Sequence, residues 1–395
     1  MYGFYEFFAG GGMVRAGLGD RWKCLFANDN SFKKGDAYTA NWGRQELSIK
    51  NVGDLRVSEL AQFADLAWAS FPCQDLSLAG GGAGLAGTKS SAFWQFWSLI
   101  GKLRKELRAP KIIAIENVMG TLSSHNGSDF MAICAALVAE GYRFGAMCID
   151  AALFLPQSRK RLFIIAVKEQ YSVPMAIVSS VPTRWHPTSI ITAVRKMPAE
   201  MSKSWIWWNP PEPIGERVTL RSVVGSIFDP ADWHDAAYTD KLLRLMAPAN
   251  LEKVKAQQLR GEEIVGTLYK RMRPSKANRN VQRAEVRFDG VAGCLRVPVG
   301  GSSRQTLIFV NGPLIKTRLI SPREAARLMG LNESYILPEN QNDALHLSGD
   351  GVVVPAVDFL ARHILEPILD YAVEANSLAF TTAAVDPLSQ GIAAE

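Results

Sequence analysis

The sequence predicts an α/β fold in which helices cover a largely parallel sheet, with a smaller second domain beside it. Over residues 1–173, short apolar runs alternate with stretches of helical periodicity, which is the pattern of a sheet wrapped by helices. After residue 173 this alternation stops, and Pro, Trp and Arg become frequent. A chain of 395 residues is long for one core and suits two lobes. Together these observations predict a doubly wound sheet with an irregular smaller domain.

Five apolar runs are the predicted strands of this sheet, and three periodic stretches between them are predicted helices. The strands are 4–8, 23–27, 66–70, 112–115 and 162–167, and the helices are 13–18, 93–107 and 130–140. In such sheets a strand that ends in a turn before a helix puts its loop at the carboxyl edge, where ligands bind. We therefore expect the functional residues to follow these strands.

The rest of the chain divides by composition into three parts. Residues 174–309 are predicted to form the irregular domain, 310–372 to return to the first domain, and 373–395 to be a disordered tail of small and polar residues. The irregular domain is rich in tryptophan, and packing in a core is a simpler interpretation of each indole than base stacking. These tryptophans are Trp185, Trp205, Trp207, Trp208 and Trp233.

The returning part carries two predicted helices. Ser321 is a typical N-cap, Pro322 follows it in the first turn, and Glu324 stands three residues after the cap, which together predict a helix running through Met329. A last helix is predicted from Pro355 to about residue 371.

Composition narrows the class of protein. Hydrophobic residues make up 48% and charged residues 21%, as in a globular rather than a disordered chain. The net charge of +6 suits a polyanionic partner but does not by itself distinguish a nucleic-acid binder from other basic proteins. Five widely spaced cysteines without a Cys-x-x-Cys pair argue against a disulfide framework and a zinc site. With no signal-peptide pattern and no apolar run near the ~20 residues of a membrane span, we expect a cytoplasmic protein without metal or membrane contact.

A glycine-rich turn follows the first predicted strand. The run Phe-Ala-Gly-Gly-Gly at 8–12 lets the backbone turn tightly before a helix whose N-terminus favours negative charge. Asp29, at the end of the second predicted strand, can accept hydrogen bonds from ribose hydroxyls. These residues suit a nicotinamide or an adenosyl cofactor equally, and they also fit a plain strand–helix turn with a surface aspartate.

Cys73 stands in Phe-Pro-Cys-Gln directly beyond a predicted strand. A lone cysteine is usually a small core residue. This one precedes a glycine-rich run at 80–87, and the combination indicates a fixed nucleophile beside a mobile loop. Glu116 ends another apolar strand, and Arg159 and Arg161 precede a further one. The plainer interpretations are that Glu116 caps a helix with its carboxylate and that Arg159 and Arg161 form a solvated surface pair.

Taken in order, these motifs resemble those of the cytosine-5 DNA methyltransferases, and the resemblance covers residues 4–172 and 293–366. The matching runs are Phe-Ala-Gly-Gly-Gly at 8–12, Gly-Asp-Leu at 53–55, Phe-Pro-Cys-Gln at 71–74, Glu-Asn-Val at 116–118, Gln-x-Arg-x-Arg at 157–161, Thr-Arg-Leu-Ile-Ser-Pro-Arg-Glu at 317–324 and Gly-Asp-Gly-Val at 349–352. Seven ordered motifs make chance a poor explanation. The resemblance implies a Rossmann-like methyltransferase sheet, with residues 174–309 as a target-recognition domain.

The resemblance also implies a covalent mechanism on a cytosine that is flipped out of double-stranded DNA. Cys73 would add its thiolate to ring carbon-6, which makes carbon-5 nucleophilic. Glu116 would contact ring nitrogen 3 and the exocyclic amine. Arg159 and Arg161 would hold the base carbonyl and the loop, and Asn117 would orient the region of Cys73.

The implied cofactor is S-adenosyl-L-methionine, and the resemblance assigns nine residues to it. They are Phe8, Gly10, Gly12, Asp29, Asp54, Leu55, Pro72, Asp350 and Val352. Two positions depart from the family pattern. Asn30 stands where relatives often have an aromatic residue that packs on adenine, and Asp350 replaces the asparagine of Gly-Asn-x-Val.

Seven residues are expected to contact the DNA. They are Gln74, Ser77, Gln157, Gly300, Gly301, Ser302 and Arg304. The enzyme is expected to act as a monomer and to associate with the nucleoid through DNA. Three alternatives stay open: an RNA cytosine-5 methyltransferase, a non-catalytic DNA-binding relative, and a nicotinamide-dependent dehydrogenase that would rest on the glycine turn alone.

Overall fold

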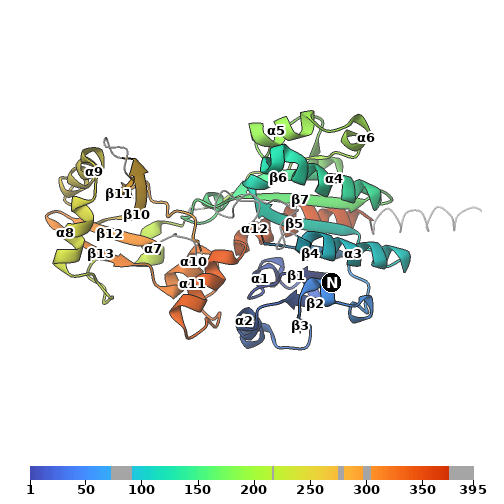
Figure 1. Ribbon diagram of the computed structural model, residues 1–395, viewed down its shortest axis with the longest axis horizontal. Coiled ribbons are helices and arrows are strands. Elements are labelled where there is room, and N and C mark those ends of the chain that lie inside the picture. Colours follow the sequence, from blue (N-terminus) through green and yellow to red (C-terminus); the bar gives the residue numbers. More distant parts are fainter. Residues whose placement is uncertain (73–90, 216–217, 275–279, 297–303, 373–395) are drawn as a thin grey trace, which may run out of the picture.

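A computed structural model describes residues 1–72, 91–215, 218–274, 280–296 and 304–372. It has a large lobe built on a wide sheet and a smaller lobe built on a second sheet, with α10 and α11 lying between them (Figure 1). The predicted tail 373–395 and the glycine-rich run 80–87 lie outside the described residues.

Seven of the described strands form the sheet of the large lobe, in the order β3-β2-β1-β4-β5-β7-β6. Their bounds are β1 Tyr2–Phe7, β2 Trp22–Asp29, β3 Leu47–Ile49, β4 Leu66–Ala69, β5 Ile112–Val118, β6 Tyr142–Asp150 and β7 Lys160–Lys168. The neighbours from β3 to β5 run parallel, whereas β7 runs antiparallel to both β5 and β6. All five predicted strands are present, and β3 and β6 are additional.

Helices cover both faces of this sheet, which confirms the doubly wound prediction. One face packs against α1 Met13–Leu18, α2 Phe32–Trp42 and α12 Val354–Leu360, and the other against α3 Ser91–Lys105, α4 Ser128–Ala139 and α5 Thr188–Arg195. Consecutive strand residues alternate between the two cores, as a period of two requires: Phe4 lies in the first and Tyr5 in the second. The two cores hold the strand ends in fixed positions.

The first part of the predicted irregular domain packs on the large lobe. The Phe144 N–H donates to the Ser204 carbonyl at 2.8 Å, and the Ile206 N–H donates to the Phe144 carbonyl at 2.6 Å. Trp208 is fully buried and Trp185 nearly so, which agrees with core packing for these two tryptophans. The elements of this stretch are β8 Val178–Ser179, α5, α6 Ala199–Ser202 and β9 Trp207–Trp208.

The small lobe is more regular than its composition suggests. Four described strands form an antiparallel sheet in the order β11-β10-β12-β13, with bounds β10 Ile264–Pro274, β11 Asn280–Arg287, β12 Thr306–Asn311 and β13 Leu314–Leu319. The helices of this lobe are α7 Leu220–Val224, α8 Ala236–Arg244 and α9 Pro248–Gln258. The predicted boundary at 309 falls inside β12, so the sheet continues to Leu319.

The returning segment begins as predicted. In α10 Pro322–Leu328, the Ser321 hydroxyl accepts from the Glu324 N–H, and the Glu324 carboxylate accepts from the Ser321 N–H, which is a complete capping box. Glu324 also forms a buried ion pair with Arg318 at 2.6 Å. Then follow α11 Gln341–Asp350 and α12, which continues through a π turn at Ala361–Leu365. Within the described residues, no helix combines the length and apolar character needed to cross a bilayer.

Candidate active site

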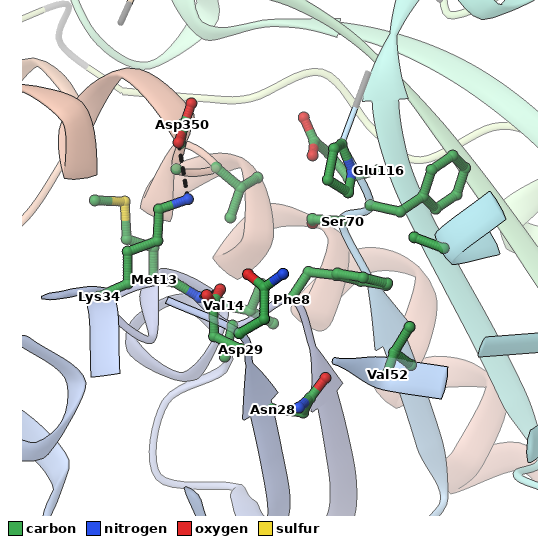
Figure 2. A pocket seen from close by; sticks show the side chains of 18 of the residues that line it. Phe8, Met13, Val14, Asn28, Asp29, Lys34, Val52, Ser70, Glu116 and Asp350 are labelled. Atoms are coloured by element: carbon green, nitrogen blue, oxygen red, sulfur yellow. Dashed lines mark hydrogen bonds and ion pairs between the residues drawn. The ribbon is translucent and has the colours of Figure 1, made fainter. Parts of the chain in front are cut away.

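A cavity of about 740 Å³ opens at the carboxyl edge of the large sheet, where β1, β2, β4 and β5 end (Figure 2). Eleven of the residues predicted from the sequence line it, although they are spread over more than 340 positions of the chain. They are Phe8, Gly10, Asp29, Asp54, Pro72, Glu116, Asn117, Arg159, Arg161, Asp350 and Val352. The parallel strands bring their carboxyl ends to this edge, and the returning segment closes the cavity opposite them.

The glycine turn after β1 has a backbone that few other sequences could adopt. Gly10 and Gly12 have φ of 57° and 77°, and Phe8 holds φ of 61° without being glycine. A side chain at Gly12 would collide with the indole of Trp42, so Gly12 faces the protein and does not line the cavity. At Gly10 an added Cβ would meet no atom within 4 Å. Gly10 therefore borders open space, which suits close approach of a ligand.

Asp29 is fixed by the backbone on both sides. Its Oδ2 accepts from the Gly10 N–H at 2.9 Å and its Oδ1 from the Ser31 N–H at 2.9 Å. These bonds tie the end of β2 to the turn after β1, and each oxygen keeps a further lone pair for a ligand hydroxyl. Asn30, the first departure from the family pattern, is exposed and donates to the Asn51 side chain at 3.1 Å.

Glu116 and Arg161 form an ion pair at the cavity wall, with 3.1 Å between Oε1 and Nε. The two side chains are only 9% and 16% exposed, so the charges interact with little screening from water. Asn117, the next residue, donates from its side chain to the Phe71 carbonyl at 3.4 Å. The acid and its arginine thus lie beside the backbone that leads into position 73.

Arg159 has a different environment from Arg161. It is 3% exposed, and its Nη atoms donate to the carbonyls of Leu295 at 3.0 Å, Gly349 at 3.0 Å and Gly351 at 2.7 Å. Burial, and then the positive charge of Arg161, lower its pKa. Arg159 therefore ties the start of β7 to Leu295 and to the returning segment at Gly349 and Gly351, whereas Arg161 is the arginine placed against Glu116.

Cys294 completes this cluster and was not singled out in the sequence. Its sulfur accepts from Arg159 at 3.5 Å and from Arg161 at 3.9 Å. Burial raises the pKa of the thiol, but the two guanidinium groups outweigh that effect and the net pKa is lowered. The available signal was its position at the start of 293–366, the second stretch of the chain that the resemblance covers.

The remaining predicted residues lie away from the cavity or outside the described residues. Gln157 is fully buried, donating to the Leu328 carbonyl at 2.6 Å and accepting from the Leu295 N–H at 3.2 Å, so its amide is engaged inside the protein. Arg304 contacts the Asn342 side chain, and Leu55 is buried in the core. The predicted residues outside the described parts of the chain are Cys73, Gln74, Ser77, Gly300, Gly301 and Ser302.

Two further features of this region follow from the structure rather than from sequence motifs. Lys34 lines the cavity and pairs with Asp350. Beneath the glycine turn, Glu6 of β1 is completely buried. Among the described residues, no group of three or more His, Cys, Asp or Glu side chains could hold a metal ion.

Relatives of known class cover nearly the whole chain. The Type II methyltransferase M.Bsp6I of Bacillus sp. (strain RFL6) is 24% identical over 377 residues, covering 92% of this chain and 98% of that protein. M.HhaI of Haemophilus parahaemolyticus, also a Type II methyltransferase, is 23% identical over 365 residues, covering 91% and 93%.

Solved structures with the same fold include the Dnmt2 methyltransferase of S. pombe, with a TM-score of 0.55 and 16% identity over 93% of this chain and 99% of that chain. The Entamoeba histolytica methyltransferase EhMeth gives a TM-score of 0.57 with 14% identity, over 94% and 98%. The model of the family described as C-5 cytosine-specific DNA methylase matches residues 2–366. Because that match spans both lobes and the returning segment, the chain belongs to the C-5 cytosine-specific DNA methylase family, as its motifs predicted.

Proposed function

We propose that this enzyme transfers a methyl group from S-adenosyl-L-methionine to carbon-5 of a flipped-out cytosine in a specific duplex DNA sequence, through a covalent adduct of Cys73 at ring carbon-6. The observation that carries the proposal is the Glu116–Arg161 pair, 3.1 Å apart, in the wall of a cavity that is also lined by Pro72, the residue before Cys73 in the sequence. Addition of a thiolate to a cytosine ring needs an acid at ring nitrogen 3 and a cation that fixes this acid, and Glu116 and Arg161 can supply these two groups.

The cavity fits the proposed cofactor. Its volume of about 740 Å³ lies within the range of roughly 300–1,000 Å³ that is usual for small-molecule sites. Gly10 leaves open space at the turn, and Asp29 is positioned to accept from ribose hydroxyls. Asp54, which the resemblance assigns to the cofactor, lines the wall together with Val52, and we place the adenine against these two residues. When bound, the cofactor would supply the electrophilic methyl group.

The residues of the chain would then act in sequence. The Cys73 thiolate forms a bond to cytosine carbon-6, and the electron pair of the 5,6 double bond becomes available at carbon-5. Glu116 holds a proton at ring nitrogen 3 and stabilises the negative charge that develops on the ring. Arg161 keeps the Glu116 carboxyl in place and can donate from its Nη atoms to the base carbonyl. Loss of the carbon-5 proton to water and departure of Cys73 restore the aromatic ring.

The small lobe supplies a basic surface suited to DNA. We propose this lobe, from α7 to β13, as the part of the predicted target-recognition domain at 174–309 that contacts DNA, since the first part of that range packs on the large lobe. On the β10–β11 hairpin, Arg271 and Arg273 are about half exposed, and both pair with Glu285. Exposed guanidinium groups on a hairpin suit contacts to phosphates or to base edges. In a cell, binding of this kind would place the enzyme in the cytoplasm, at the nucleoid.

Trapping on modified DNA tests the mechanism. Fluorine at carbon-5 of the target cytosine cannot leave as a proton does, so the wild-type enzyme should form a stable covalent complex with 5-fluorocytosine duplex DNA in the presence of cofactor. Cys73→Ala should form none, whereas Cys148→Ala, a control on β6, should behave as wild type. Absence of an adduct with the wild-type enzyme would support a non-catalytic DNA-binding role. Methylation of transfer RNA alone, in a parallel assay, would contradict the DNA substrate.

A further inference from the structure

An ion pair at the rim of the cavity joins α2, in the N-terminal part of the chain, to α11 of the returning segment. Lys34 lies in the first turn of α2, where its N–H donates to the N-cap hydroxyl of Ser31 at 3.4 Å. Its ammonium contacts the carboxylate of Asp350, the last residue of α11, at 2.8 Å. Figure 2 shows this contact above Asp29, with both side chains at the edge of the cavity.

Both charges are accessible to a ligand. The side chains of Lys34 and Asp350 are 29% and 45% exposed, and both residues line the cavity. Burial alone would lower the pKa of Lys34, but the charges of Asp350 and Asp29 outweigh it, so the pKa is raised and the ammonium stays charged at neutral pH. In the contact with Asp350, the Lys34 ammonium uses one of its three N–H donors, and the Asp350 carboxylate keeps further lone pairs that can accept.

We propose that Lys34 and Asp350 together recognise the zwitterionic amino-acid end of the cofactor, with the lysine ammonium binding the α-carboxylate and the aspartate binding the α-ammonium. The inference rests on the proposed function, and it assigns a specificity-determining pair to the cofactor site. A Lys–Asp pair presents one positive and one negative group side by side, which is the charge pattern complementary to an α-amino acid.

The position of the pair within the cavity fits this end of the cofactor. Figure 2 shows Lys34 and Asp350 on one side of the cavity and Val52 on the other, with Asp29 and Phe8 between them. The adenosine part is proposed to lie against Asp29 and Val52, so the amino-acid chain extends away from Val52 towards Lys34 and Asp350. Asp350 departs from the family pattern because it adds a negative charge to the cavity. Lys34 balances this charge, and the pairing explains how the cavity accommodates an aspartate at this position.

The same two helices provide a matched control. Lys33, the neighbour of Lys34, pairs with Asp343 of α11 at 2.9 Å. Its side chain is 73% exposed, and neither residue lines the large cavity. Loss of this pair removes a similar α2–α11 contact without removing a charge from the cofactor site.

Binding of two cofactor analogues to the full chain tests the inference without any methyl transfer. S-adenosyl-homocysteine carries both α-groups, whereas 5′-methylthioadenosine lacks the amino-acid end. By isothermal titration, Lys34→Met should weaken S-adenosyl-homocysteine binding by at least about tenfold, the value of one charge-assisted hydrogen bond, and leave 5′-methylthioadenosine within about twofold. Lys33→Met should change neither, and thermal unfolding should show that both variants are folded.

A charge exchange separates recognition from a purely structural tie. The double variant Lys34→Asp with Asp350→Lys keeps an ion pair between α2 and α11 but reverses its polarity. Recognition predicts that the weak binding of S-adenosyl-homocysteine persists in this variant, whereas recovery of wild-type affinity would overturn the inference. Equal losses for both analogues in Lys34→Met would overturn it as well.

The outcome also separates this inference from the proposed function. If the wild-type enzyme binds neither analogue, the cofactor assignment fails and the inference fails with it. If it binds both analogues with the expected pattern but methylates no duplex DNA, the substrate proposal fails and the role of Lys34 and Asp350 stands.

Discussion

Replacement of Glu6 by glutamine should change how the stability of the enzyme depends on pH. Glu6 lies in β1 between Ala27 of β2 and Trp68 of β4, and it is fully buried. Neither carboxylate oxygen has a hydrogen-bond partner among the described residues. Burial raises the pKa of Glu6 from its ordinary value of 4.5 to about 8, and the nearby N–H groups of Val14 and Arg15 and the Arg15 charge offset only part of this effect.

The sign and size of the effect follow from this pKa. Below pH 4.5 both the folded and the unfolded chain hold the Glu6 proton, so ionisation contributes nothing. Between pH 4.5 and about 8 the unfolded chain has released the proton while the folded protein retains it, so the free energy of unfolding falls as pH rises. At 1.36 kcal/mol per pKa unit, the full loss has an upper limit of about 5 kcal/mol. Glu6→Gln cannot ionise and should escape this loss.

Urea unfolding of the wild type and of Glu6→Gln at several values from pH 5 to pH 8.5 measures the difference. The two proteins should be similar at pH 5, and the variant should gain several kcal/mol relative to the wild type by pH 8.5. Glu59→Gln provides a contrast of opposite sign. Hydrogen bonds from the Lys50 side chain and then from the Arg56 N–H lower the pKa of Glu59. The contribution of the Glu59 carboxylate to stability is therefore present at neutral pH and lost in acid. A difference between Glu6→Gln and the wild type that stays constant from pH 5 to 8.5 would refute the reasoning.

Two further predictions concern the cluster at the cavity wall. Arg161→Lys should lower kcat by about 10²-fold with little change in cofactor KM, because a lysine cannot both hold Glu116 and reach the base. Arg159→Lys should instead lower Tm, because the buried carbonyls that Arg159 contacts lose their donors. The same change in kcat and Tm in both variants would contradict this division of roles. Limiting iodoacetamide at pH 7, followed by peptide mass spectrometry, should label Cys294 before Cys24, Cys134 and Cys148, because guanidinium groups lower the Cys294 pKa while burial raises the other three. Earlier labelling of Cys148 would contradict this order.

The large lobe could be predicted from sequence because its strands are continuous apolar runs. Strands buried on both faces, such as β5, leave a clear signal, and all five predicted strands are present. The short strand β3 was missed because three half-buried residues carry too little pattern. The direction of β7 was not predictable from its residues, since a buried strand has the same composition whether it runs parallel or antiparallel.

The small lobe was harder to predict because its strands carry charge. In β10 the apolar run at its start gives way to Lys270, Arg271 and Arg273, so periodicity fades within one strand. Half of the sheet also comes from β12 and β13, on the far side of a glycine-rich stretch. Pairing across that distance in sequence depends on tertiary contacts, which local patterns do not record.

The convergence of the predicted residues on one cavity was foreseeable because parallel strands end at the same edge of a sheet. Asp29 is the last residue of β2 and Glu116 lies near the end of β5, and the sheet places both at one cavity. Sequence order could not show which arginine of Gln-x-Arg-x-Arg meets Glu116. The start of β7 decides it: Arg161 lies in the strand, opposite Val118 of β5 and beside Glu116, whereas Arg159 precedes the strand and reaches the carbonyls of the returning segment.

Asp350 illustrates what a residue-by-residue comparison leaves out. Considered alone, a carboxylate in place of the family's asparagine adds an unbalanced negative charge to the cavity. Its partner Lys34 lies 316 positions away, and the fold brings the two within 2.8 Å. The cavity is assembled from the N-terminal part of the chain and the returning segment. A change of charge in one of these parts can therefore be balanced by a residue of the other. Lys34 and Asp350 must therefore be judged as one unit, and we expect affinity for the cofactor to depend on the pair rather than on Asp350 alone.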